Sequence, residues 1–258
     1  MDTSAYVKAA VEQTGVLAGW VDGKDAATRV PTCPEWALSD LVDHVGGVQQ
    51  MVTTLVRDRL LDPTPAFAVA PGPADPAEWR AWLTGCADEV RQAYSAVTDE
   101  TPVWDPSGAA AGVPFWARRV FGEVCVHRAD AAAALGLPYE LAPDLAVAAL
   151  ADWLATMTSR GYWDNVPRFA EAMRGNGQTL RFQATDAPGA DWLARREQDG
   201  VVLEQGGDKA DVTVSGPVTD LLLVITRRRA LDAAPALDVQ GDRALFEHWV
   251  DHMDWVAG

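Results

Sequence analysis

The sequence predicts an α+β protein, in which an all-helical domain of about residues 1–165 precedes a small α+β domain of about residues 175–258. Three observations lead to this prediction. Apolar residues recur at helical spacing through most of the first part. Short runs of alternating apolar and polar residues, typical of strands, follow the break at 174–177. The 258 residues, 48% of them hydrophobic, also supply ample material for a core.

Five segments of the first part are expected to be helical. Ser4 can cap the first of them, and Pro114 suits the first turn of the fourth. Gly136 can end that fourth helix. The proline-rich stretch 62–76 must be a loop, because proline interrupts helical hydrogen bonding. The expected helices cover about 4–20, 37–61, 77–98, 114–135 and 142–160.

In the second part, strands are expected where apolar and polar residues alternate between Gly and Asp turns. A short helix is predicted from Leu221 to Arg228, and a terminal helix from Asp242 onward. The predicted strands cover 180–184, 201–204, 212–215 and 237–239.

Charge and cysteine content exclude several classes of protein. A formal net charge of −16 disfavours nucleic acids and anionic membranes as partners. The first residues lack the apolar segment of a signal peptide, and no stretch is long enough to span a membrane, so we expect a cytoplasmic protein. Three widely spaced cysteines without a CxxC pattern indicate neither a disulfide framework nor a cysteine-rich zinc site. A monomer or small homo-oligomer that acts on a small molecule is expected.

His44, Glu123 and His127 are the candidate ligands of a divalent metal. His44 falls in a helical row that also holds Leu41, Val48, Met51 and Leu55. Glu123 and His127 are one turn apart, in a row that also holds Trp116, Val120, Ala131 and Ala134. Unpaired polar groups on an apolar face cost several kcal/mol, and a metal would compensate them. Such a facial His₂Glu set leaves one coordination position open for water or substrate.

Other interpretations of these residues stay open at this point. A single buried histidine is often only a hydrogen-bonded core residue, and a Glu–His pair one turn apart can be a surface pair. His248 and His252 form a second such pair, for which a solvated helix face is the simpler interpretation because no third ligand is evident.

Other residues are candidates for supporting the site or lining it. Asp130 could orient His127 through its second ring nitrogen, or it could be a surface carboxylate. Cys125 is interpreted as a small core residue. Trp36 and Trp116 are candidates for lining a substrate pocket.

Two motifs resemble the mycothiol-dependent maleylpyruvate isomerase family. The first is Val30-Pro31-Thr32-Cys33-Pro34-Glu35-Trp36, followed by the segment that ends in His44. The second is Glu123-Val124-Cys125-Val126-His127-Arg128-Ala129-Asp130. The stretch from Asp211 to Asp242 is similar to the family's C-terminal domain, which is of sterol-carrier type. Ala129 departs from the pattern, since relatives often carry an aromatic residue there, and this leaves the substrate open.

The resemblance implies a fold, a cofactor and a cosubstrate. It implies a DinB-like four-helix bundle in which His44, Glu123 and His127 hold zinc, and mycothiol as the thiol cosubstrate. It also implies that an arginine of the C-terminal domain binds a substrate carboxylate, with Arg228 or a neighbour, Arg227 or Arg229, as the candidate.

The expected function is therefore a thiol transferase or a cis–trans isomerase of the maleylpyruvate type. A metal-bound thiolate would add to an electrophilic small molecule. Two alternatives remain at the level of the sequence. One is a metal-dependent hydrolase that activates water, and the other is a non-catalytic protein that binds a small molecule. Dependence of turnover on a thiol separates the first alternative from the expected function, and a co-purifying apolar ligand would favour the second.

Overall fold

The computed structural model describes residues 1–107, 112–207 and 209–253. The chain divides into two compact units, Met1–Tyr139 and Glu140–Gly258. The predicted α+β class is confirmed, with a helical N-terminal region and a C-terminal domain built on one mixed sheet. The fifth predicted helix belongs to the second compact unit, and the sheet itself begins at Gln178.

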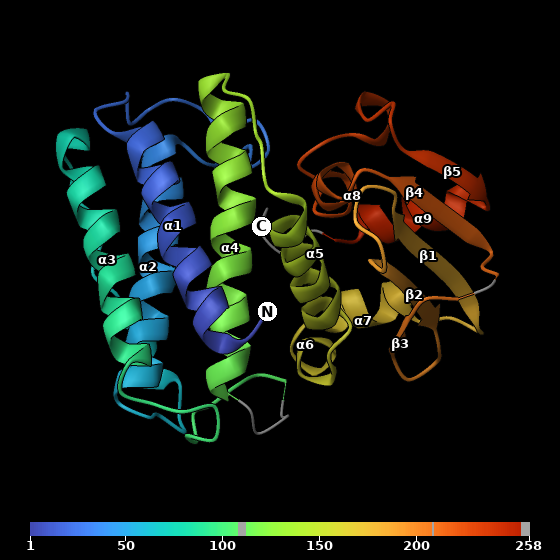
Figure 1. Ribbon diagram of the computed structural model, residues 1–258, viewed down its shortest axis with the longest axis horizontal. Coiled ribbons are helices and arrows are strands. Elements are labelled where there is room, and N and C mark those ends of the chain that lie inside the picture. Colours follow the sequence, from blue (N-terminus) through green and yellow to red (C-terminus); the bar gives the residue numbers. More distant parts are fainter. Residues whose placement is uncertain (108–111, 208, 254–258) are drawn as a thin grey trace. The chain divides into compact units, whose positions relative to one another are not determined.

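The first unit is a bundle of four long helices that run alongside one another (Figure 1). Both α1 and α2 pack against α3 and α4. Two short 3-10 turns lie in the connection between α2 and α3. The helices are α1 (Thr3–Val21), α2 (Leu38–Arg57), α3 (Trp79–Tyr94) and α4 (Gly112–Leu135), and the turns are η1 (Thr64–Phe67) and η2 (Pro76–Glu78).

The ends of these helices follow from local chemistry. Asp2, rather than the predicted Ser4, caps α1, because the helix begins at Thr3 and the Asp2 carboxylate accepts a hydrogen bond from the Ala5 amide at 2.8 Å. Gly136 ends α4 as predicted, with a φ of 65° that favours glycine. Most residues of α4 are buried, and they include four polar ones, Arg119, His127, Arg128 and Asp130.

The second unit holds a five-stranded sheet in the order β3-β2-β1-β4-β5. The β1–β4 pair is parallel, and the other neighbouring pairs are antiparallel. The strands are β1 (Gln178–Ala184), β2 (Asp191–Arg196), β3 (Val201–Gln205), β4 (Val212–Gly216) and β5 (Asp238–Gly241). The helices are α5 (Pro143–Met157), α6 (Arg160–Asn165), α7 (Pro167–Met173), α8 (Val218–Ile225) and α9 (Arg243–Asp251), with one 3-10 turn, η3 (Leu231–Ala233).

Several details of this unit differ from the sequence-based expectation, and they include the two short helices α6 and α7, for which no element was predicted. Strand β2 was not predicted, because Trp192, Leu193 and Ala194 are buried in succession and break the alternation that marks a half-buried strand. Helix α8 ends at Ile225, before the predicted end at Arg228, since Arg227 adopts a left-handed φ of 62°.

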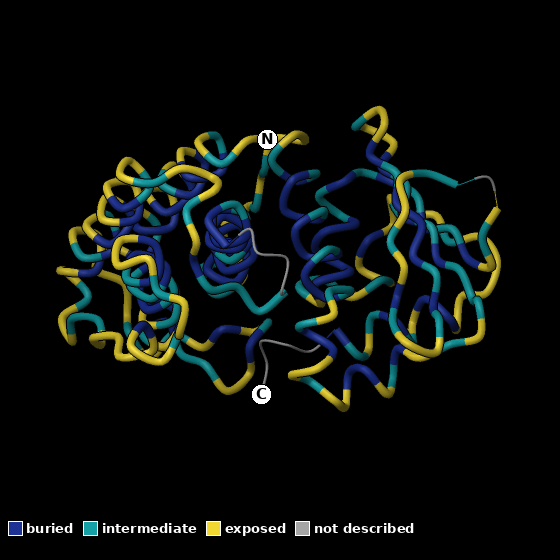
Figure 2. The backbone as a smooth tube through the Cα atoms, turned by 90° about the horizontal axis from the view of Figure 1, so that it is seen from below, coloured by how far each residue is buried: buried dark blue, intermediate teal, exposed yellow. Residues whose placement is uncertain are grey.

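Each unit has a buried interior of its own (Figure 2). In the second unit, the Phe182 ring of β1 packs against the rings of Phe246 and Trp249 from α9, with centroids 6.4 and 5.8 Å away. Within the described residues, no helix combines the length and the apolar character needed to cross a lipid bilayer.

Candidate metal centre

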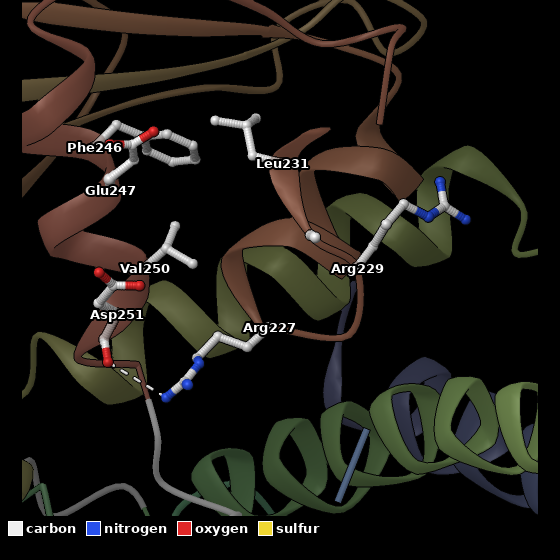
Figure 3. Close-up of a pocket in the computed structure, with 8 residues that line it drawn as sticks. Arg227, Arg229, Leu231, Phe246, Glu247, Val250 and Asp251 are labelled. Atoms are coloured by element: carbon white, nitrogen blue, oxygen red, sulfur yellow. Dashed lines mark hydrogen bonds between the residues drawn. The ribbon is translucent and has the colours of Figure 1, made fainter. Parts of the chain in front are cut away.

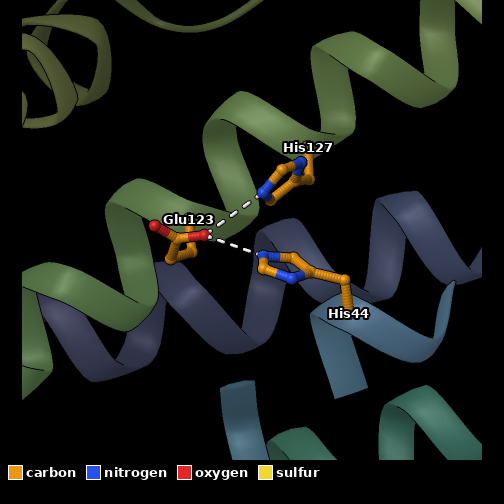
Figure 4. A group of neighbouring side chains, drawn as sticks. All are labelled: His44, Glu123 and His127. Carbon is orange, nitrogen blue, oxygen red and sulfur yellow. Dashed lines mark hydrogen bonds and ion pairs between the residues drawn. The ribbon is translucent and has the colours of Figure 1, made fainter. Parts of the chain in front are cut away.

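The side chains of His44, Glu123 and His127 meet between α2 and α4. Figure 4 shows both imidazoles directed at the same carboxylate oxygen of Glu123. The Nε2 atoms of His44 and His127 each lie 3.2 Å from Glu123 Oε2. His127 is fully buried, whereas 30% of the His44 side chain is exposed, so the cluster has a dry side and a side open to solvent.

The spacing of these atoms fits a metal ion. Nitrogen and oxygen ligands about 2.1 Å from one tetrahedral ion are about 3.4 Å apart, which is close to the observed separations. The candidate ligand atoms of all three side chains lie within 4.8 Å of one another. Imidazole nitrogen and carboxylate oxygen are also a donor set that zinc and related divalent ions accept. Among the described residues, no other group of His, Cys, Asp and Glu side chains has this arrangement.

Asp130 binds the second nitrogen of His127. Its Oδ2 lies 2.8 Å from His127 Nδ1, and both side chains are fully buried. The carboxylates of Asp130 and Glu123 therefore lie against the two ring nitrogens of His127. Because two lone pairs would repel each other, Nε2 must carry either a proton or a metal ion where it faces Glu123. A proton on Nδ1 that is donated to Asp130 leaves Nε2 with a lone pair aimed at the cluster, as a metal ligand requires.

The charges in this cluster shift the pKa values of its members. Burial favours a neutral Glu123, but the charge of Arg119 and the two histidines outweigh it, and the pKa of Glu123 falls well below its ordinary value. Burial likewise lowers the pKa of His127, but hydrogen bonds to Asp130 and Glu123 reverse this and raise it. Glu123 is therefore a carboxylate at neutral pH, in the protonation state that binds a metal.

Arg119 is a member of the cluster that the sequence analysis missed. Its guanidinium forms an ion pair with Glu123 Oε1, and only 8% of its side chain is exposed. Because Arg119 occupies Oε1, the carboxylate presents Oε2 alone to the two imidazoles. The available signal was the spacing of four residues between Arg119 and Glu123 on a helix, which places the two on one face.

Trp36 lies against both histidines. Its ring centroid is 5.0 Å from that of His44 and 5.6 Å from that of His127, nearly parallel to the latter. Trp36 is half-buried, and it comes from the loop between α1 and α2. The indole thus covers one side of the cluster with an apolar surface.

Trp116, His248 and His252, which the sequence analysis also discussed, have contacts of their own. Trp116 packs against the rings of Phe115 and Trp104 and donates its indole N–H to the Trp104 carbonyl at 2.6 Å. His248 contacts the Ala172 carbonyl at 2.7 Å, and His252 contacts the His248 carbonyl at 2.8 Å, so both bind backbone oxygens.

Arg227 and Arg228 belong to the second unit. Arg227 lines a cavity there and donates to the Asp251 carbonyl at 3.3 Å, as Figure 3 shows. Arg229 lines the same cavity and forms an ion pair with Asp220. Arg228 donates to the Thr226 carbonyl at 2.8 Å. A role of these arginines in binding substrate remains a prediction.

Comparison with known families identifies both parts of the chain. Residues 7–132 match the mycothiol maleylpyruvate isomerase N-terminal domain, and residues 144–248 match the C-terminal domain of the same family. The chain belongs to the mycothiol-dependent maleylpyruvate isomerase family. A search of curated proteins gave no significant match.

Solved structures of the mycothiol-dependent maleylpyruvate isomerase share the fold of this family member. One matches with a TM-score of 0.55 and 13% identity, over 93% of each chain. A histidine-to-alanine mutant matches with a TM-score of 0.57 and 13% identity, over 92% of this chain and 91% of the other. A UbiJ-SCP2 ubiquinone synthesis protein matches at 20% identity, over 46% of this chain and 95% of the other, with a TM-score of 0.34.

Proposed function

We propose that this chain is a metal-dependent enzyme that adds the sulfur of mycothiol to an electrophilic carbon of a small molecule. The observation that carries the proposal is the convergence of His44, Glu123 and His127 on one point, in a chain that belongs to the maleylpyruvate isomerase family. Three protein ligands favour catalysis over a structural role, since structural zinc sites have four.

The residues of the cluster have different proposed roles. His44 Nε2, His127 Nε2 and Glu123 Oε2 would hold the ion, for which zinc is the expected choice. Such an ion supplies the Lewis acidity that keeps a thiol ionised at neutral pH. Asp130 orients His127, and Arg119 restricts Glu123 to one ligating oxygen. Trp36 limits the access of water to the two imidazoles.

The proposed reaction begins with formation of a carbon–sulfur bond. With a cis-alkene flanked by carbonyl groups, the thiolate adds to one alkene carbon, the electron pair of the double bond moves onto the neighbouring carbonyl as an enolate, and the former double bond becomes a single bond that can rotate. Return of the electron pair from the enolate expels the thiolate and restores the alkene in the trans form. With an electrophile that does not eliminate the thiol, the enolate takes up a proton from solvent, and the product is a thioether conjugate. Arg228 or Arg227 is proposed to bind a carboxylate of the substrate, with Trp36 and Trp116 lining its pocket.

The test measures metal and thiol dependence together. Purified protein is analysed for bound metal, and turnover of maleylpyruvate and of other electrophiles is measured with mycothiol, with another thiol and without any thiol. We expect about one metal ion per chain and turnover only with mycothiol. Turnover without a thiol would instead indicate a hydrolase, and a co-purifying apolar ligand without turnover would indicate a binding protein.

Removal of one ligand provides the decisive variant. His44→Ala should weaken metal binding by about 100-fold or more, since even the loss of an outer partner costs 10–100-fold. Turnover should be lost with the metal. His252→Ala is the matched control, because the hydrogen bond of the His252 ring goes to a backbone carbonyl, that of His248. Full metal content and full turnover in His44→Ala would refute the site.

A further inference from the structure

The buried Asp130 carboxylate is held from two elements of the fold. From its own helix, α4, His127 Nδ1 lies 2.8 Å from Oδ2. From the loop between α1 and α2, the Thr32 hydroxyl donates to Oδ1 at 2.5 Å, and the Cys33 thiol lies 3.8 Å from Oδ2. Asp130 itself is fully buried. Contacts on both oxygens fix the rotation of the carboxylate about its own bond, which a contact on Oδ2 alone would leave free.

The loop that carries Thr32 is closed by its own backbone. Arg29 and Ala37 form an isolated antiparallel bridge at its base. Within it, the Val30 amide donates to the Trp36 carbonyl at 3.1 Å, and the Trp36 amide donates to the Cys33 carbonyl at 2.8 Å. None of these hydrogen bonds uses the Thr32 side chain. The loop should therefore keep its shape when the Thr32 hydroxyl is removed.

The contacts form one continuous path from this loop to the proposed metal ligand. The Thr32 hydroxyl binds one oxygen of Asp130, and the other oxygen binds the ring nitrogen of His127 that faces away from the cluster. The orientation of a ligating imidazole depends on the partner of its second nitrogen, and the loss of such a partner commonly weakens metal binding 10–100-fold. Because the Thr32 hydroxyl holds the Asp130 carboxylate in place, it also affects the orientation of the His127 ring.

We propose that Thr32 is a positioning residue for the metal centre, which acts through Asp130 to hold the His127 ring in its ligating orientation. This inference rests on the proposed function, because it requires that His127 binds a metal. It assigns a role in metal affinity to a residue that is linked to the proposed ligand His127 through two hydrogen bonds. The simpler alternative is that Thr32 only fastens its loop to α4, which would affect folding stability but not metal affinity.

The main test compares Thr32→Val with Thr32→Ser. Valine has nearly the same shape without the hydroxyl, and serine keeps the hydroxyl without the methyl group. The affinity of each purified protein for zinc is measured by competition with a chromophoric chelator. The visible absorption of the cobalt(II)-substituted protein reports the geometry around the ion. We expect Thr32→Val to bind zinc about 10-fold more weakly, with an altered cobalt spectrum, and Thr32→Ser to restore both.

A double-mutant cycle tests the route through Asp130. If Thr32 acts only through this carboxylate, Thr32→Val should cost affinity in the native background and nothing further in the Asp130→Asn background. Equal losses in both backgrounds would overturn the route.

Thr53→Val is the matched control for the substitution. Thr53 is a buried threonine of the bundle, on α2, whereas Thr32 is half-buried, and the Thr53 hydroxyl has no hydrogen-bond partner among the described residues. Its replacement should leave zinc affinity unchanged. If Thr32→Val does not fold, as judged by circular dichroism of the metal-free protein, Thr32→Ala with Thr53→Ala as control takes its place.

The outcomes separate this inference from the proposed function. Native zinc affinity in a folded Thr32→Val protein, with weak binding in His44→Ala, would overturn the role of Thr32 and leave the metal centre intact. Native affinity in His44→Ala as well would remove the metal centre and the inference with it.

Discussion

The interface between α2 and α4 and the interior of the sheet unit bury different kinds of side chain. In the first, His127 and Asp130 are fully buried, and Arg119 and Glu123 are 8% and 12% exposed. In the second, Phe182, Phe246 and Trp249 pack together with no exposed surface. Apolar packing stabilises a fold without further conditions, whereas buried charges cost free energy unless each has a partner. The buried charges of the helical unit therefore cost folding free energy, and the proposed metal chemistry explains why they are there. The apolar interior of the sheet unit stabilises the fold.

Trp249→Ala should have the largest effect on stability and the smallest on the metal. Removing this fully buried ring should lower the free energy of unfolding by about 3–5 kcal/mol, because it leaves a cavity beside Phe182. Zinc affinity should stay native, since the cluster lies in the other unit. Urea unfolding followed by circular dichroism, together with a zinc titration, measures both. A large loss of zinc affinity would contradict the division of roles between the two interiors.

Helical periodicity made His44, Glu123 and His127 candidate ligands, the resemblance of two motifs to a known family supported that choice, and the roles of neighbouring residues stayed open. His44, Glu123 and His127 fall on apolar rows of two helices, so their meeting follows once the helices pack. Asp130 had two equal interpretations, and its complete burial together with its 2.8 Å contact to His127 Nδ1 decides between them.

Two features could not be predicted because local pattern does not encode them. Arg119 lies one helical turn before Glu123, but the same spacing is common in exposed surface pairs, so it does not by itself show that Arg119 is buried. Strand β2 buries consecutive residues, so the period-two signal is missing although its neighbours β1 and β3 pair with it along its whole length. Both depend on the tertiary environment, which overrides local preference.

Arg119→Gln should destabilise the metal-free protein by about 3 kcal/mol, because it leaves the Glu123 carboxylate without its positive partner. Bound zinc supplies positive charge at the same carboxylate, so the loss should be much smaller in the metal-loaded protein. Thermal unfolding with and without zinc measures the difference. Arg118→Gln is the control, since Arg118 is not buried. Equal losses with and without zinc would indicate that Arg119 acts on packing rather than on the charge of Glu123.

Gly46→Ala should connect packing with metal binding inside the helical unit. A Cβ atom at this position of α2 would lie 2.1 Å from the Trp82 ring, so helix or indole must move. Overpacking of this kind costs about 1–3 kcal/mol. Because Gly46 is two residues from His44, zinc affinity should fall along with stability. Gly85→Ala is the control, since a Cβ atom there meets nothing within 4 Å. Native zinc affinity in Gly46→Ala would show that α2 moves without displacing His44.

Arg195→Ala should have the smallest effect, and it completes the contrast between buried and exposed charge. Arg195 binds Glu204 across β2 and β3 at 2.6 Å, but the two side chains are 38% and 46% exposed. Water screens such a pair, so its loss should cost no more than about 1 kcal/mol, and less at high salt. Chemical unfolding at low and high ionic strength checks this. A loss of unfolding free energy as large as that of metal-free Arg119→Gln would mean that the sheet also depends on its ion pairs. Burial alone would then not decide which charged pairs contribute to stability.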